Sequence, residues 1–237
     1  MTIPTVLQHY PLASYFLSGY LARNDDPTNF PPAEFPDLFQ RYENLFKAAL
    51  DALGISQERI RRLSEFNFDS DDANNLEAGI GVLRAVEALN LLGFRCIKLL
   101  SPPGADIYCE KNGQKVCCEA KTITKQSVGR RGFFLADQLF EKIAETLPKA
   151  RKQLESTARR LQCEVKFPVY VMNWLEHSIV LDQENYQQIV SKLESSGQLL
   201  GLDRILFVTK MGERRFHLQD SPDIAAMLDI PRPTTSQ

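Results

Sequence analysis

The dipeptide Asn112-Gly113, which lies between two runs of strand-forming residues, constrains the fold of this chain more than any other feature. Asn-Gly favours the positive backbone angles of a two-residue turn whose twist matches that of an antiparallel hairpin. If these two residues form the loop, Lys111 pairs with Gln114, and the pairing continues outward one residue at a time. The sequence therefore predicts a hairpin in which Asp106 faces Glu119.

Side chains alternate along each strand, so this hairpin has two distinct faces. One face is predicted to carry charged groups, including Asp106, Glu119 and Lys121, with Cys117 among them. The other is predicted to be the core face and consists of Ala105, Ile107, Cys109, Val116, Cys118 and Ala120. The candidate functional side chains are therefore predicted to lie on one face of this hairpin.

Two carboxylates in direct opposition require a physical reason. Their Cβ atoms lie roughly 4.5–5.5 Å apart, and like charges at that separation destabilise a sheet. A shared proton or a bound cation removes the repulsion. Mg²⁺ takes one or two protein carboxylates together with water and phosphate oxygens, and Asp106 and Glu119 fit that requirement. The alternative is a solvated hairpin face on which Lys115 and Lys121 neutralise neighbouring acids.

The rest of the chain alternates helical and strand patterns, which predicts a mixed α/β (α+β) class. Helices are expected at 11–22, 34–53, 76–92, 133–161 and 182–193, with a short helix after Ser56. Strands are expected at 94–100, 105–110, 115–121 and 167–174, followed by a late hairpin of 204–210 with 214–218. The polar, acidic stretch 67–75 is expected to separate an N-terminal helical extension, 1–70, from the main domain, 71–237.

Asp106 followed by Glu119-Ala120-Lys121, after a helix and a strand, resembles the PD-(D/E)xK nuclease superfamily. Ala105 stands where the usual proline precedes the aspartate. The resemblance implies a restriction-endonuclease-like core, with a mixed central sheet flanked by helices. It also implies that Mg²⁺ or Mn²⁺ binds to Asp106, Glu119 and the backbone carbonyl of Ala120, and that Lys121 positions the attacking water.

Many members of this superfamily add a glutamate from the first core helix. Glu77 is the expected contributor to catalysis, with Glu87 as the alternative. Acidic residues are also favoured near helix starts by the helix dipole, which would account for Glu77 without any catalytic role. The second Glu-x-Lys triplet, Glu164-Val165-Lys166, has no opposed acid across an Asn-Gly hairpin and serves as an internal control.

The net charge of −2 conceals a strong gradient along the chain. Residues 121–160 contain ten Lys or Arg and four Asp or Glu, whereas residues 1–80 contain six and twelve. A basic block beside the proposed site suits contacts with phosphates, and Lys125, Arg130 and Arg131 are the expected nucleic-acid-binding residues. Nucleic acid, with DNA favoured over RNA, is the expected partner, and the resemblance also implies a homodimer.

Several other classes of protein are excluded or disfavoured by the same sequence. The five cysteines include no Cys-x-x-Cys pair and the three histidines are far apart, which argues against a zinc finger or a disulfide scaffold. The uncharged run 2–22 is too polar for a membrane span and lacks the basic segment of a signal peptide, so no membrane role is expected. The odd number of cysteines suits reduced thiols, so a cytoplasmic location is expected. The sequence predicts a metal-dependent nuclease; the alternative is a catalytically inactive nuclease-fold module that binds nucleic acid or a protein partner.

Overall fold

The computed structural model describes residues 8–23, 36–63, 66–68, 73–123, 136–172, 183–209 and 223–230. The helices are α1 (Pro11–Arg23), α2 (Pro36–Leu53), α3 (Gln57–Arg61), α4 (Ala73–Leu91), α5 (Ala136–Leu161) and α6 (Gln183–Ser195). The strands are β1 (Arg95–Leu99), β2 (Ile107–Lys111), β3 (Gln114–Ile123), β4 (Val165–Met172), β5 (Arg204–Thr209) and β6 (Asp223–Asp229). The order helix, three strands, helix, strand is the one expected for the main domain.

The six strands form one mixed sheet in the order β1-β2-β3-β4-β5-β6. The first three strands pair antiparallel, β3, β4 and β5 pair parallel, and β6 returns antiparallel to β5. The parallel pair β3 and β4 is joined through α5, the crossover that a parallel pair requires. The fold class is therefore mixed α/β, as the sequence predicts.

The β2–β3 hairpin has the register predicted from its turn. Lys111 pairs with Gln114, and the pairing continues to Ile107 with Cys118. Asn112 and Gly113 have φ angles of 52° and 78°, the left-handed conformation that this turn requires. Asp106 and Glu119 are the next residues outward, one step beyond the last strand pair.

Local sequence signals mark two of the helix ends. Ser56 caps α3, because its hydroxyl oxygen accepts a hydrogen bond from the backbone N–H of Arg59 at 3.4 Å. Gly54, directly after α2, adopts a φ of 61° that suits a helix C-cap. Helix α5 runs through Pro148 to Leu161. These ends depend on neighbouring residues only, which is why the sequence predicts them well.

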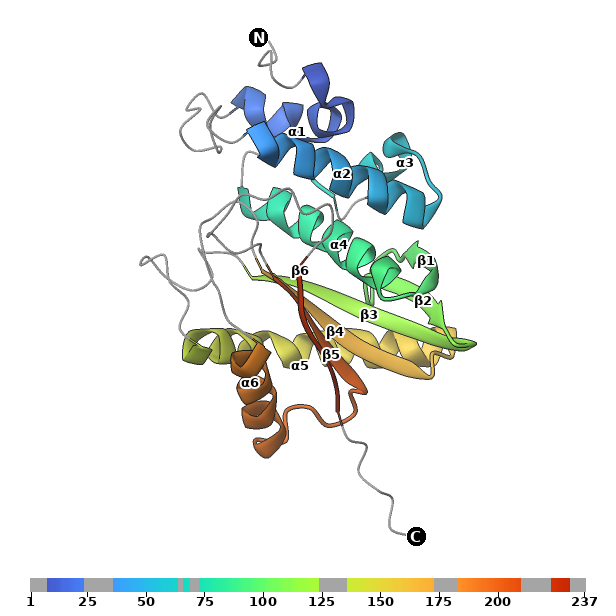
Figure 1. Cartoon of the computed structure of the whole chain (residues 1–237). Coiled ribbons are helices and arrows are strands. Elements are labelled where there is room, and N and C mark those ends of the chain that lie inside the picture. The colour runs from blue at the N-terminus through green and yellow to red at the C-terminus, as the bar shows by residue number, and fades with distance from the viewer. Residues whose placement is uncertain are drawn as a thin grey trace.

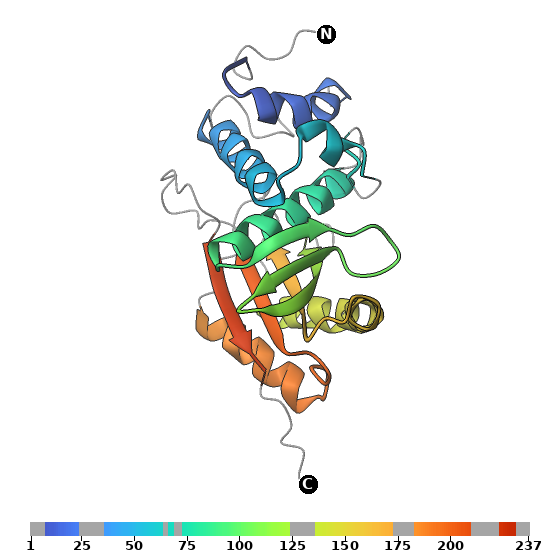
Figure 2. The same cartoon turned by 90° about the vertical axis from the view of Figure 1, so that its right-hand side faces the viewer.

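The sheet separates two hydrophobic clusters. Helix α4 covers one face together with α2, and α5 and α6 cover the other. Figure 1 shows α1–α4 above the sheet and α5 and α6 below it, and Figure 2 shows the same layers after a quarter turn. Both faces of the central strands are therefore buried between helices.

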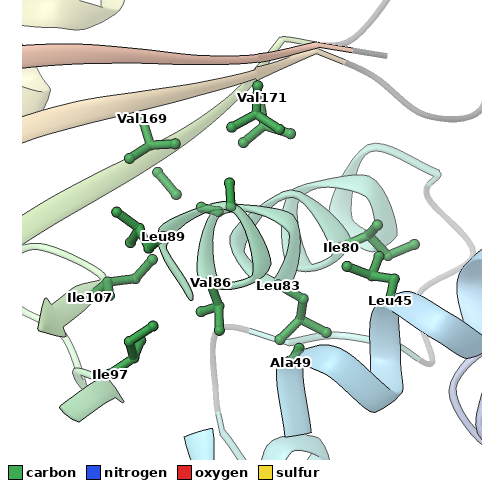
Figure 3. Packing of buried hydrophobic residues seen from close by; sticks show 14 of the residues in the cluster. Leu45, Ala49, Ile80, Leu83, Val86, Leu89, Ile97, Ile107, Val169 and Val171 are labelled. Carbon is green, nitrogen blue, oxygen red and sulfur yellow. The ribbon is translucent and has the colours of Figure 1, made fainter. Parts of the chain in front are cut away.

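Helix α4 is the central layer between the N-terminal helices and the sheet. In Figure 3, Leu83 and Ile80 of α4 lie toward Ala49 and Leu45 of α2, and Leu89 lies on the side of Ile107. All of these side chains are almost completely buried. Helices α1 and α2 thus share one hydrophobic cluster with α4 and the sheet. The boundary near residue 70 itself stays a prediction.

One alternative and one expectation from the sequence are wrong. The face with Glu119 and Cys117 is not a solvated face, because α5 covers it and both residues are at most 1% exposed. Strand β5 pairs with β4 and with β6, residues 223–229, whereas the sequence predicts a hairpin of 204–210 with 214–218. Residues 214–218 lie outside the described residues. Among the described helices, none is both long and apolar enough to span a membrane.

Candidate active site

Asp106 and Glu119 come together at the end of the β2–β3 hairpin nearest the turn between β1 and β2. Asp106 Oδ2 accepts a hydrogen bond from the backbone N–H of Ala120 at 2.8 Å, which fixes the aspartate beside β3. Glu119 is the neighbouring residue on that strand and is 1% exposed. The predicted carboxylate pair is therefore present.

The Glu119 carboxyl is in a poor environment for a negative charge. Burial, followed by the charge of Asp106, raises its pKa from 4.5 to about 7, although Lys121 lowers it. Its Oε2 atom is buried and, within the described residues, has no hydrogen-bond partner. A buried acceptor beside a second carboxylate favours a proton or a hard cation. The residues present therefore fit a divalent metal ion.

Lys121 lies on the same side of β3 as Glu119. Its Nζ atom forms an ion pair with Glu119 Oε1 and lies 3.3 Å from Gln153 Oε1 of α5. The side chain of Lys121 is 20% exposed, and its ammonium group is held by two partners. The two carboxylates and the lysine form the cluster that the sequence predicts.

Helix α5 also holds the chain segment just before Asp106. Gln153 Nε2 donates a hydrogen bond to Gly104 O at 3.0 Å, and the backbone N–H of Ala105 donates to Thr157 Oγ1 at 2.8 Å. A Cβ atom on Gly104 would lie 2.5 Å from that hydroxyl oxygen, so the close approach needs glycine. Helix α5 therefore positions both the lysine and the aspartate.

Sequence reasoning missed Gln153 and Thr157. The apolar stripe of α5 contains Ala150 and Leu154 at helical spacing, and Thr157, 1% exposed, continues it. Thr157 is a polar residue at a position where the apolar stripe of the helix predicts a buried side chain, and this was the signal that could have identified it. Nothing in the sequence indicates that Gln153 reaches β3, because that contact depends on how the helix is rotated over the sheet.

The two glutamates expected from the first core helix lie on α4. Both are buried, with exposed fractions of 6% for Glu77 and 5% for Glu87, and α4 covers the face of the sheet opposite α5. Burial raises the pKa of Glu87 to about 7, and Arg84 lowers it. Within the residues that the structure describes, no three His, Cys, Asp or Glu side chains gather closely enough to hold a metal ion together.

The predicted nucleic-acid-binding residues Lys125, Arg130 and Arg131 lie outside the described residues. Cys117 is completely buried, and its thiol donates a hydrogen bond to Leu154 O at 3.7 Å. Burial raises the pKa of this thiol far above its ordinary value, which keeps it protonated. Cys117 therefore lacks the thiolate character of a nucleophile.

Comparison with known proteins identifies one distant structural similarity. No protein-family model and no curated protein match the chain. A structure of Pyrococcus furiosus SfsA in complex with Ca²⁺ is similar at 14% sequence identity and a TM-score of 0.27. The match covers 65% of this chain and 62% of that chain, which is less than two thirds of its length. What the present site can do follows from its own geometry.

Proposed function

We propose that this protein is a divalent-metal-dependent nuclease that hydrolyses phosphodiester bonds of nucleic acid. The observation that carries the proposal is the buried Glu119 carboxylate, which faces Asp106 and is flanked by Lys121. Two carboxylates at one end of a hairpin, with a lysine beside them, provide ligands for a hard cation and a positive charge for a phosphate.

Each residue has a distinct role in this proposal. Asp106, Glu119 and the backbone carbonyl of Ala120 would hold Mg²⁺ or Mn²⁺. A bound metal ion would polarise the scissile phosphate and lower the pKa of a coordinated water. Lys121 Nζ, already held between Glu119 and Gln153, would orient that water or stabilise negative charge on the phosphate. Helix α5 would help to keep Lys121 in place through Gln153.

A cleavage assay tests the proposal. Labelled DNA and RNA are incubated with Mg²⁺ or Mn²⁺ and with the wild type, Asp106→Asn or Lys121→Ala. Each substitution is expected to lower the rate by about 100-fold or more, because each removes a group at the reacting phosphate. Melting curves report whether the variants fold.

The second Glu-x-Lys triplet supplies the matched control. Glu164 is exposed and Lys166 lies on β4, where its backbone N–H donates to Asp203 Oδ2. Replacing the side chains by Glu164→Gln and Lys166→Ala should leave cleavage unchanged. Equal cleavage by the wild type, Asp106→Asn and Lys121→Ala would remove the catalytic assignment.

The second candidate is a catalytically inactive module of the same fold that binds nucleic acid or a protein partner. One observation favours it: in the described part of the chain, no third acid joins Asp106 and Glu119. Binding of nucleic acid without cleavage in either metal, by a folded wild type, would support this function over the nuclease.

A further inference from the structure

Helix α5 presents two different edges to the rest of the protein. On one edge, Arg151 donates a hydrogen bond to Gln198 O, and Glu155 lies close to Gly201. Gln198 and Gly201 both follow the end of α6 in the chain. On the other edge, Gln153 and Arg160 donate to the turn that precedes Asp106. Figure 2 shows the same arrangement, with α6 on one side of α5 and the loop between β1 and β2 on the other.

The edge that borders the site is basic. Lys149, Gln153 and Arg160 are separated by four and seven residues, spacings that return to the same side of an α-helix. Lys149 and Arg160 are exposed, and Gln153 between them contacts Lys121 Nζ at 3.3 Å. The acid between positions 149 and 160, Glu155, lies on the opposite edge. A line of positive charge therefore passes directly beside Lys121.

We propose that this basic edge of α5 binds the phosphodiester backbone of nucleic acid on both sides of the phosphate that reaches Lys121. The inference rests on the proposed function and adds the path of the substrate to it. Eleven residues of helix span ~16 Å, and each nucleotide of one duplex strand advances ~3.4 Å along the duplex axis. Lys149 and Arg160 thus contact phosphates several nucleotides apart, with the reacting phosphate between them.

The same helix contains a matched set of cations that do not face the site. Lys152 and Arg159 are exposed, like Lys149 and Arg160, and each precedes an edge residue by one position. One residue turns the direction of a helical side chain by about 100°. Removing either pair changes the net charge equally. General electrostatic attraction therefore predicts equal effects for the two pairs, whereas a defined path predicts unequal ones.

Fluorescence anisotropy with labelled DNA or RNA, single-stranded or duplex, tests the path. Binding is measured in EDTA, where metal-dependent cleavage does not occur, over a range of salt concentrations. The double variant Lys149→Gln with Arg160→Gln should bind about 10-fold more weakly. The slope of its log affinity against log salt concentration should fall by the equivalent of about two phosphate contacts. Lys152→Gln with Arg159→Gln should change the affinity by less than about twofold.

Arg160 Nη1 also lies 3.4 Å from Pro103 O, so its loss could disturb the turn before Asp106. The single variant Lys149→Gln removes only an exposed charge and should still weaken binding by about threefold. Equal weakening by the two double variants, or no weakening by Lys149→Gln, would overturn the proposed path.

The experiment separates this inference from the nuclease proposal. Binding that depends on Lys149 and Arg160, in a protein that never cleaves, would keep the path and reject the nuclease. Cleavage that requires Asp106 and Lys121, with both double variants binding equally, would keep the nuclease and reject the path. DNA and RNA give separate outcomes, because each is measured in its own arm.

Discussion

The backbone N–H of Ala120 donates a hydrogen bond to Asp106 Oδ2 at 2.8 Å across the β2–β3 hairpin. This bond holds the aspartate beside β3 although Asp106 precedes the first strand residue of β2. It also leaves the neighbouring Glu119 carboxyl facing a second carboxyl in a buried position. The electrostatic strain at Glu119 therefore comes first from burial and second from the charge of Asp106, which this main-chain contact holds in place.

Metal binding should relieve this strain. With 10 mM Mg²⁺ or with Mn²⁺, the wild type should melt at a higher temperature, because a ligand bound only by the folded state stabilises it by about 2.7 kcal/mol at 100 times Kd. Glu119→Gln should lose this metal-dependent increase, whereas Glu164→Gln should retain it. Calorimetry or dye-monitored melting measures the shift. An equal shift in both variants would place the ion elsewhere.

Gln153 should act as a positioning residue for Lys121. Gln153→Leu removes both the acceptor for Lys121 Nζ and the donor to Gly104, and should lower the single-turnover cleavage rate by about 10-fold. Gln153→Glu keeps the acceptor, so it should recover most of the rate if the contact with Lys121 is the important one. Unchanged nucleic-acid affinity in the uncharged variant Gln153→Leu distinguishes positioning from binding.

Gly81→Ala should destabilise the protein, although alanine normally favours a helix over glycine by about 1 kcal/mol. A Cβ atom on Gly81 would overlap Thr122 Oγ1 and lie 3.1 Å from Thr122 Cβ, so α4 would have to move away from β3. We expect a loss of about 2–3 kcal/mol in the free energy of unfolding, measured by urea denaturation.

The matched control for this substitution is Gly79→Ala, where the new Cβ would meet the side chain of Phe66 at 3.1 Å. An aromatic ring can shift more easily than a short β-branched side chain whose Cβ is itself 3.1 Å away, so the loss should be smaller. The double variant Gly81→Ala with Thr122→Ala should recover part of the stability. Independent, additive effects of these two substitutions would contradict the close approach.

Glu87 should make the stability depend on pH. Burial raises its pKa from 4.5 to about 7 in the folded protein, so the folded state binds more protons than the unfolded state in that range. The free energy of unfolding therefore falls as the pH rises from 4.5 to about 7. Glu87→Gln removes this loss, and its stability relative to the wild type should increase by about 3 kcal/mol between pH 4.5 and pH 8.

Urea denaturation at a series of pH values measures this effect. The pKa of Glu119 is raised as well, so Glu119 adds its own pH dependence to the stability of both proteins. The effect of Glu87 is therefore the difference in stability between the wild type and Glu87→Gln at each pH. A difference between the two proteins that does not change with pH would show that Glu87 titrates normally in the folded state.

The sequence by itself determined the hairpin register and thereby the meeting of Asp106 with Glu119. That inference needed only the Asn112-Gly113 turn and the alternation of side chains, both of which are properties of neighbouring residues. The cap at Ser56 and the helical patterns followed from equally local signals. These features were predictable because few distant contacts can change them.

Only the tertiary structure decided what surrounds the carboxylates. The burial of Glu119 and the contact between Gln153 and Lys121 arise because α5 crosses one face of the sheet at a particular rotation. The pairing of β5 with β6 likewise depends on which strands the tertiary fold brings side by side. Such packing depends on the shapes of many side chains at once, so no local pattern in the sequence specifies it.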